Sequence, residues 1–449
     1  MAKPASNRAK QPKRDVLESP LSATWQRRQR ERAVLVGVGR GIDESCLDEL
    51  AALADTAGAE PVARVVQSRS GPDPATFVGK GKIAEIHDAV HRSGADTVVL
   101  DDELSAGQLR NLEERLGTKV IDRTALILDI FALHARSREG KAQVELAQLN
   151  YLLPRLRGWG EAMSRLGAGI GTRGPGETKL EVDRQHIKRR ITRLRRDIKD
   201  LARTRSVKRS QRESSGVPQV AIAGYTNAGK STLMNALTEA HVLVADQLFA
   251  TLDPTTRRIT LPGGRNATLS DTVGFVGKLP HDLVEAFRST LEEVTLAALI
   301  VHVADAASRE VEDQVRAVRG VLADIGAGDI PEVLALNKAD VLSEEDARRV
   351  AGRFPDAVVI SASTGAGVEG LVERIAVALP SPPIEVTVLV PYGREEVVAG
   401  VYRTGEVLDS EETEEGTRLH ARIQERELAR VRDFIVYPVR REVARERSG

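Results

Sequence analysis

Hydrophobic positions in the first third of this 449-residue chain fall into short apolar runs separated by amphipathic stretches. The runs at residues 33–38, 62–67, 97–101 and 119–122 predict strands. The stretches at 44–57, 82–92 and 105–116 predict helices, the last with a capping box formed by Ser105 and Gln108. Strands that alternate with helices predict a parallel sheet. A small parallel α/β domain is therefore expected over residues 33–135.

A longer region with helical periodicity follows, in residues 136–215. A heptad seam along one face of a long helix is predicted by Leu180, Ile187, Ile191, Leu194, Ile198 and Leu201. An upstream amphipathic stretch, 144–156, can pack against this seam with Leu146, Leu149, Leu152, Leu153 and Leu156. Pro154 would end or kink that first helix. The pattern predicts a helical hairpin whose tip is the Gly-rich run 166–180 (LGAGIGTRGPGETKL).

Apolar runs in the second half predict strands that each end at a polar motif. They lie at 220–223, 266–270, 333–336 and 357–360, and a helix is expected over 231–237. Together they predict one domain over 216–380. After a Ser-Pro-Pro linker at 381–383, a strand (385–390), a helix (395–401) and a strand (419–423) predict a small α+β domain over 384–449.

The first motif, residues 224–231 (GYTNAGKS), fits the phosphate-loop pattern and stands between a predicted strand and a predicted helix. Gly224 and Gly229 allow the backbone to approach phosphates closely, and the N–H groups converge at a helix N-terminus. Lys230 would neutralise the β- and γ-phosphates, and the Ser231 hydroxyl would bind Mg²⁺. A nucleoside triphosphate site is expected here.

Two further motifs supply the switch chemistry of such a site. Asp271, in residues 271–274 (DTVG), would hold Mg²⁺ through a water molecule, and Gly274 would offer its N–H to a γ-phosphate. A Thr-rich stretch, 249–256 (FATLDPTT), lies between this motif and the phosphate loop. Chemistry alone leaves Thr251, Thr255 and Thr256 open as the switch ligand of the metal.

The motif at residues 337–340 (NKAD) selects the base. The Asp340 carboxylate offers only acceptors, and guanine presents two adjacent donors where adenine has none. Asn337 would bond the other edge of the base, the Lys338 stem would cover its face, and residues 361–363 (SAS) would offer a backbone N–H to guanine O6. GTP is therefore the expected substrate, with Mg²⁺ as the cofactor.

These motifs, together with the Gly-rich run 166–180, resemble those of the HflX family of ribosome-associated, translational-type GTPases of the TRAFAC class. The resemblance covers most of the chain. It implies Mg²⁺ ligation by Ser231 and Thr251, and catalytic roles for Lys230, Thr251 and Gly274. It also implies nucleotide contacts from Gly224, Tyr225, Thr226, Asn227, Ala228, Gly229, Lys230, Ser231, Phe249, Ala250, Thr251, Leu252, Asp253, Asp271, Thr272, Val273, Gly274, Asn337, Lys338, Ala339, Asp340, Ser361, Ala362 and Ser363.

Phe275 stands where many signalling GTPases carry the Gln that orients the attacking water. Slow intrinsic hydrolysis that needs an external surface is one interpretation. The other is that Phe275 is a packing residue and another group orients the water. His281 and His302 are not favoured as bases, because lone histidines are more often surface or core residues.

Formal net charge is +0, but the segment 178–212 holds 14 Lys or Arg against 4 Asp or Glu. A basic hairpin with a flexible tip carrying Arg165, Arg173 and Lys179, and with Trp159 nearby, suits RNA phosphates. A solvated coiled coil fits the charge equally well. The resemblance favours contact with RNA of the large ribosomal subunit.

Three other segments leave alternatives open. Residues 77–82 (FVGKGK) open a helix and could bind an anion, although a cap or turn is the favoured interpretation. The acidic stretch 406–415 argues against RNA contact by the C-terminal domain and favours a protein, such as a ribosomal protein, over a purely structural role. Residues 1–32 are basic and lack an apolar core, so they predict a disordered tail and not a signal peptide.

Composition excludes several classes of protein. A hydrophobic content of 41% is ample for several cores. Cys46 is the single cysteine, so an intramolecular disulfide and a thiolate metal cluster are excluded. The longest apolar run, 296–303, is too short to span a membrane. A cytoplasmic, monomeric protein is expected.

The resemblance implies a GTPase that binds the large ribosomal subunit in its GTP state, splits or rescues stalled or stressed ribosomes, and leaves after hydrolysis stimulated by the ribosome. The alternatives are a GTPase of ribosomal subunit assembly, a nucleotide-gated RNA-binding scaffold with little turnover, and, more distantly, an ATP-driven RNA remodeller.

Overall fold

The computed structural model describes residues 30–156, 175–213, 217–238, 248–249, 251, 255–262, 265–278, 283, 293–380, 384–423 and 427–436. The chain divides into two compact units. The first consists of residues 1–212 and 217–374, and the second of residues 213–216 and 375–449. Within the described ranges, no helix combines the length and the apolar character needed to cross a membrane.

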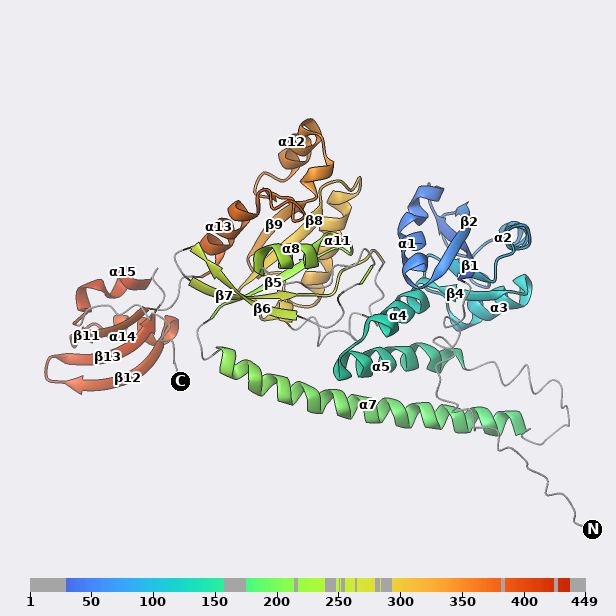
Figure 1. Ribbon diagram of the computed structural model, residues 1–449. Coiled ribbons are helices and arrows are strands. Elements are labelled where there is room, and N and C mark those ends of the chain that lie inside the picture. Colours follow the sequence, from blue (N-terminus) through green and yellow to red (C-terminus); the bar gives the residue numbers. More distant parts are fainter. Residues whose placement is uncertain are drawn as a thin grey trace, which may run out of the picture. The chain divides into compact units, whose positions relative to one another are not determined.

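A four-stranded parallel sheet, in the order β2-β1-β3-β4, begins the first unit (Figure 1). Its strands are β1 (Glu31–Gly39), β2 (Ala59–Ser68), β3 (Thr97–Leu100) and β4 (Lys119–Asp122). Its helices are η1 (Glu44–Leu47), α1 (Asp48–Thr56), α2 (Lys80–Ser93), α3 (Ala106–Leu116) and α4 (Arg123–His134). The predicted parallel α/β domain is confirmed.

Alternate residues of β1 belong to two hydrophobic cores, one on each face of the sheet, because successive side chains of a strand point to opposite faces. Val34 and Val36 pack with α2 and α3. Ala33 and Leu35 pack with α1 and α4. The capping box of α3 is present: Ser105 Oγ accepts from the Gln108 N–H, and Gln108 Oε1 accepts from the Ser105 N–H.

The described helices that follow are α5 (Arg138–Arg155) and α7 (Pro175–Glu213). In the predicted seam of α7, Ile191 and Leu194 are buried, and Arg190 forms a two-pronged ion pair with Glu145 of α5, at 2.6 and 2.7 Å. Pro154 stands one residue before the end of α5, as predicted. The leucines of α5 are only partly buried, because Val144 and Ala147 form its buried face and pack against the α4 side of the sheet.

The second sheet of this unit has six strands in the order β10-β9-β8-β5-β7-β6, all parallel except β6. The strands are β5 (Gln219–Gly224), β6 (Thr255–Leu261), β7 (Arg265–Asp271), β8 (Leu299–Asp305), β9 (Glu332–Asn337) and β10 (Val358–Val359). The helices are α8 (Lys230–Thr238), α11 (Val311–Asp324), η3 (Ala339–Val341), α12 (Glu344–Arg353) and α13 (Val368–Ala378). This is the predicted P-loop GTPase fold, and its motifs follow the carboxyl ends of β5, β7, β9 and β10.

The second unit contains a three-stranded antiparallel sheet in the order β11-β13-β12. Its elements are β11 (Ile384–Val390), α14 (Glu395–Thr404), β12 (Glu406–Thr413), β13 (Gly416–Ile423), α15 (Leu428–Val431) and η5 (Arg432–Phe434). The predicted strand, helix and strand are present. The acidic stretch 406–415, for which the sequence pattern predicted no structure, contains the whole of the edge strand β12.

Candidate nucleotide site

The phosphate loop joins β5 to α8, and two of its glycines are required by the backbone. Gly224 has φ +154°, and a Cβ there would lie 2.1 Å from the Val303 carbonyl oxygen. Gly229 has φ +91°, and a Cβ would lie 2.2 Å from Asn337 Nδ2. Between them, Asn227 adopts φ +59°. The loop therefore has the tight, side-chain-free course that lets backbone N–H groups converge on an anion.

Lys230 lies at the start of α8 with its side chain folded back over the loop. Its ammonium donates to the carbonyl oxygens of Gly224, at 3.1 Å, and Tyr225, at 2.7 Å. The residue is buried, and burial lowers the pKa of Lys230 to about 8, with the Asp271 charge opposing the shift. A buried cation held this close to the loop is well placed to meet phosphate oxygens.

Three oxygen-bearing side chains meet beside the loop. Asp271 Oδ2, at the end of β7, accepts from Ser231 Oγ at 2.8 Å and from Thr251 Oγ1 at 3.1 Å, and the two hydroxyls are 3.1 Å apart. Burial raises the pKa of Asp271, although Lys230 and the two hydroxyls oppose this. Its other oxygen, Oδ1, is buried and has no hydrogen-bond partner among the described residues. Hard oxygen donors around an unsatisfied buried carboxylate fit Mg²⁺, and of the three open candidates for the switch ligand, Thr251 is the one in this cluster.

Asn337 connects three of the predicted motifs. Its side-chain amide donates to the Ala228 carbonyl oxygen at 2.8 Å, and its Oδ1 accepts from the Ala362 N–H at 2.9 Å. The residue is 2% exposed. The phosphate loop, the NKAD segment and the SAS segment are thereby held at one edge of the sheet.

The remaining residues of the two base motifs lie next to each other. Asp340 is exposed, and its Oδ1 accepts from Ser361 Oγ at 2.6 Å. This bond is the largest of the causes that lower the pKa of Asp340. Ser361 Oγ also lies 3.0 Å from Ser363 Oγ, and Lys338, at φ +66°, pairs with Asp305 at 2.8 Å. The Ala339 N–H bonds the Ile360 carbonyl oxygen. The carboxylate is thus ionised, fixed and open to solvent.

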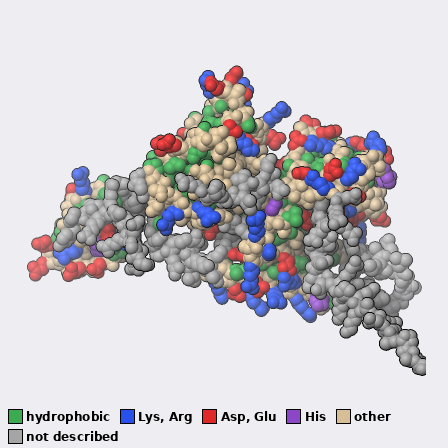
Figure 2. Space-filling model, viewed as in Figure 1, with side chains coloured by type: hydrophobic (Ala, Val, Ile, Leu, Met, Phe, Trp, Pro, Cys, Tyr) green, Lys and Arg blue, Asp and Glu red, His purple; other side chains and the backbone are tan. Residues whose placement is uncertain are grey.

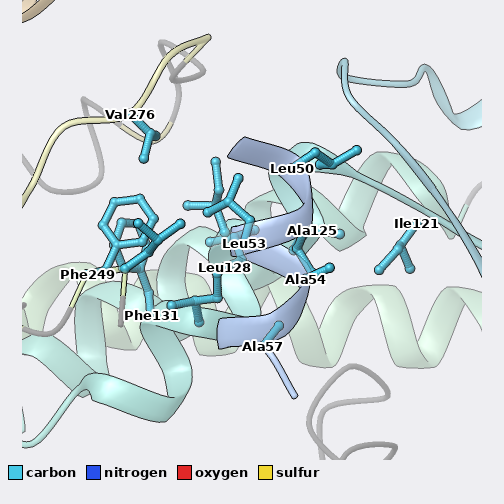
Figure 3. Close-up of a cluster of buried hydrophobic side chains, with 14 of the residues drawn as sticks. Leu50, Leu53, Ala54, Ala57, Ile121, Ala125, Leu128, Phe131, Phe249 and Val276 are labelled. Carbon is cyan, nitrogen blue, oxygen red and sulfur yellow. The ribbon is translucent and has the colours of Figure 1, made fainter. Parts of the chain in front are cut away.

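Several predicted contact residues direct their side chains into the protein. Phe249 and Val273 belong to a core cluster with α1 and α4 (Figure 3). Thr272 Oγ1 donates to the Ile222 carbonyl oxygen at 2.7 Å, and the Thr226 N–H donates to the Phe275 carbonyl oxygen at 2.7 Å. Figure 3 draws the Phe249 ring beside Phe131. In the described structure, Phe249, Val273 and Thr272 therefore leave mainly backbone atoms for a nucleotide.

Phe275 and His302 both have structural partners. Phe275 is 2% exposed in a cluster with Ala221, Ala223 and Tyr225, which agrees with the interpretation of Phe275 as a packing residue. His302, within β8, is buried with its Nδ1 2.7 Å from Glu332 Oε1. His281 lies outside the described residues, as do Ala250, Leu252 and Asp253.

The basic hairpin is described only in part. The tip residues 157–174, with Trp159, Arg165 and Arg173, lie outside the described ranges. Lys179 was expected in the tip, but the backbone there is already helical, because α7 begins at Pro175, a residue suited to a first helical turn. Within residues 77–82, Phe77 has φ +63°, Gly79 is the N-cap residue of α2 and residues 80–82 begin this helix, in agreement with a cap or turn.

Sequence reasoning missed a group of charged residues in the α/β domain that touches the loops of the site. Glu49 of α1 and Arg123 of α4 bond Tyr225 and Gly277, and Asp101 binds Lys278. One signal was available: Arg123 lies between the apolar runs 120–121 and 125–128, and a charged residue that is buried between such runs needs partners. The sequence does not name those partners.

Three family models match the chain. They describe a GTP-binding GTPase N-terminal region over residues 44–132, a GTP-binding GTPase middle region over 134–212 and a 50S ribosome-binding GTPase over 219–338. The chain is 47% identical to GTPase HflX of Caldanaerobacter subterraneus subsp. tengcongensis over 410 residues, 91% of this chain and 95% of that protein.

The chain is also 46% identical to GTPase HflX of Escherichia coli (strain K12), over 80% of this chain and 86% of the relative. Among solved structures, a GTP-binding protein from the archaeon Sulfolobus solfataricus in complex with GDP matches with 25% identity, over 78% of this chain and 98% of that chain, at a TM-score of 0.41. From its family models and relatives, this chain belongs to the HflX family and is a GTP hydrolase.

Proposed function

We propose that the protein binds GTP with Mg²⁺ at the site described above and uses GTP hydrolysis to act on the large ribosomal subunit. The observation that carries the nucleotide part is the cluster of Ser231, Thr251 and Asp271, with a buried carboxylate oxygen that has no partner in the described part of the chain. Ser231 and Thr251 would hold the ion directly, and Asp271 would hold it through water. Bound Mg²⁺ would neutralise charge on the phosphate oxygens.

The other residues of the site would bind and orient the substrate. Lys230 would leave the loop carbonyls to meet the β- and γ-phosphates, and the Gly274 N–H would contact the γ-phosphate. Asp340 would accept from the N1–H and the 2-amino group of guanine. With adenine, that carboxylate would lose both partners, which predicts a preference of two or more decades, on the order of a few kcal/mol.

Exchange of a single atom in Asp340 tests the assignment of the base. In Asp340→Asn, an NH₂ group that donates replaces one carboxylate oxygen that accepts. Guanine therefore loses one of its two acceptors. Xanthine, which carries a carbonyl oxygen in place of the 2-amino group, gains a donor. Calorimetry should find GDP binding weakened about 100-fold and XDP binding strengthened. Unchanged GDP affinity, or tighter binding of adenine nucleotides by the parent protein, would refute the base assignment.

The ribosomal part of the proposal is supported by the description of the matched model, a 50S ribosome-binding GTPase, and by the surface of α7. Lys and Arg side chains gather along this helix in Figure 2. Lys188, Arg189, Arg193 and Arg196 lie close together on one face of this helix, with Thr192 and Asp197 between them. Closely spaced cations on one helix suit RNA phosphates, because counterion release then supplies affinity.

In this proposal the GTP form docks α7 and the Gly-rich tip on the large subunit and splits or rescues stalled ribosomes, and ribosome-stimulated hydrolysis releases the protein. It acts as a cytoplasmic monomer, and the C-terminal domain contacts a ribosomal protein. The sequence motifs of the family support this version over a role in subunit assembly. GTP-dependent splitting of mature ribosomes would support it, and binding to immature subunits alone would support assembly.

Sedimentation through sucrose with purified subunits, in GTP analogue, GDP or no nucleotide, tests the docking. We expect the large subunit to pellet the protein best with the analogue. The triple variant Arg189→Gln, Arg193→Gln, Arg196→Gln should bind more weakly, and its log–log salt slope should flatten by roughly 0.7 for each phosphate that the variant no longer neutralises. Arg348→Gln on α12, an exposed position paired with Glu344, serves as control. Phosphate release that large subunits fail to stimulate would favour a scaffold with little turnover.

A further inference from the structure

The hydroxyl of Tyr225, in the phosphate loop, lies between the α/β domain and the segment that follows Gly274. It donates to Glu49 Oε2 of α1 and accepts from the Gly277 N–H. Burial raises the pKa of Tyr225, and the Glu49 carboxylate raises it further, so the hydroxyl keeps the proton that it donates. A Cβ on Gly277 would lie 2.9 Å from this hydroxyl, which makes the approach close.

Arg123, the first residue of α4, completes the network from the other side of Gly277. Its Nη2 donates to Glu49 Oε1 and, at 2.8 Å, to the Gly277 carbonyl oxygen, while Nη1 donates to Asp101 Oδ1 at 2.6 Å. Lys278, which follows Gly277 in the chain, pairs with the same Asp101 at 2.7 Å. Both polar backbone groups of Gly277 are therefore held by side chains that Glu49 orients.

Leu248 and Phe249, where the Thr-rich stretch begins, contact the same domain. The rings of Phe249 and Phe131 of α4 pack edge to face, with centroids 4.6 Å apart and planes at 66° (Figure 3). The Leu248 N–H donates to Thr56 Oγ1 of α1 at 3.3 Å. Val276 joins this cluster from the segment after Gly274. Phe249 lies two residues before Thr251, and Gly277 three residues after Gly274, so the α/β domain holds both segments next to the expected metal ligand and phosphate donor.

We propose that Glu49, together with Arg123, is a positioning residue for the GTPase site: through Tyr225 and Gly277 it holds the segment that carries Gly274 against the phosphate loop in the arrangement required by GTP. This inference rests on the proposed function, because Thr251 and Gly274 matter only if they contact Mg²⁺ and the third phosphate. In the arrangement held by these contacts, Thr251 Oγ1 is 3.1 Å from Asp271 Oδ2, within the expected metal site.

Preorganisation explains how residues that do not touch the nucleotide affect its binding. A segment that is already ordered loses less conformational freedom when the γ-phosphate contacts form. GDP lacks that phosphate and makes no use of Gly274. Removal of the Glu49 hydrogen bonds is therefore expected to lower kcat and to reduce the preference for GTP over GDP. The affinity for GDP itself should not change.

The test compares Glu49→Gln, Tyr225→Phe and the double variant with the parent full-length protein. Calorimetry with GDP and with a non-hydrolysable GTP analogue gives the ratio of affinities, and phosphate release gives kcat. Glu49→Gln should keep GDP affinity within about twofold and lose about tenfold in analogue affinity and in kcat, the size of a charge-assisted hydrogen bond. The loss in the double variant should be smaller than the sum of the two single losses, because both changes remove the hydrogen bond between Tyr225 and Glu49.

Asp48→Asn is the matched control, because Asp48 precedes Glu49 on α1 and pairs with Arg64 inside the α/β domain. It should leave the affinity ratio and kcat unchanged. Glu49→Gln with the parental ratio and kcat, or additive losses in the double variant, would overturn the positioning role and leave GTP binding intact. An equal loss of GDP and analogue affinity would also overturn it, since it would mark a general defect in folding. A parent protein that binds no guanine nucleotide would instead refute the proposed function.

Discussion

Replacement of Gly229 by alanine should disconnect the phosphate loop from the base motifs. Gly229 has φ +91°, a conformation that L side chains rarely adopt. The added Cβ would lie 2.2 Å from Asn337 Nδ2 and 3.5 Å from Asn337 Cγ. The backbone cannot relax freely, because the Leu233 N–H bonds the Gly229 carbonyl oxygen at 2.9 Å in the first turn of α8. The buried Asn337 side chain must therefore move.

The magnitude is the sum of a backbone cost and a polar cost. Alanine in a left-handed conformation costs roughly 1 kcal/mol. Displacement of Asn337 gives up its bonds to the Ala228 carbonyl oxygen and the Ala362 N–H. At about 1 kcal/mol for each bond, the total is about 3 kcal/mol, which corresponds to about 100-fold in an equilibrium constant. We expect most of it in GDP affinity, since the two broken bonds hold together the loops that surround the nucleotide.

Calorimetry with GDP and urea unfolding separate the two contributions. Gly320→Ala is the control, because Gly320 lies within α11, has no positive φ, and its added Cβ would meet nothing within 4 Å. That change should stabilise the protein by about 0.5 to 1 kcal/mol and leave GDP affinity unchanged. Gly229→Ala with GDP affinity within threefold of the parent, and with parental stability, would refute the reasoning.

Two further predictions concern buried charges in the nucleotide-free protein. Burial lowers the pKa of Lys230 from 10.5 to about 8. Between these values the unfolded chain binds the additional proton, so the free energy of unfolding should rise with pH across that window, and Lys230→Met should abolish the rise in urea unfolding. Burial raises the pKa of Asp271, so its charge costs stability near neutral pH. Asp271→Asn should therefore keep the stability of the parent, while Mg²⁺-dependent phosphate release falls about 100-fold or more.

A flat stability profile of the parent protein between pH 8 and 10.5 would mean that the Lys230 ammonium is not destabilised by burial. For Asp271→Asn, a clear loss of stability would mean that the carboxylate supports the fold through Ser231 and Thr251 in the absence of metal. Unchanged turnover would mean that Asp271 has no part in holding the ion.

The nucleotide motifs were predictable because their chemistry is local and their spacing is fixed by the sheet. Each follows a run of apolar residues, and the carboxyl ends of parallel strands meet at one edge. The sequence therefore indicated that Ser231, Asp271 and Asn337 lie near one another. It left three threonines open as the switch ligand, because the course of a loop between two strands is set by what the loop packs against.

The sequence pattern did not predict the elements whose apolar residues lack a regular spacing. Helix α4 was not predicted because the residues from Arg123 to Phe131 are all buried, so no polar face marks a helical repeat. β12 was missed for the opposite reason: its acidic side chains are mostly exposed on an edge strand. β6 was not predicted as a strand, and only its first two residues, Thr255 and Thr256, belong to the Thr-rich stretch. In each case tertiary position, and not local pattern, determines the structure.

Tyr225 shows how a sequence can indicate hydrogen bonds between the phosphate loop and another domain. The phosphate-loop pattern constrains its glycines, its Lys and its Ser or Thr, and leaves the intervening positions free. A tyrosine hydroxyl at a free position has no task toward phosphates, and when buried it needs a hydrogen-bond partner. Likewise Arg123, 3% exposed, must find carboxylates. A polar residue without a role in its motif and a charged residue between apolar runs are therefore candidates to share a hydrogen-bond partner. Here Tyr225 and Arg123 share Glu49.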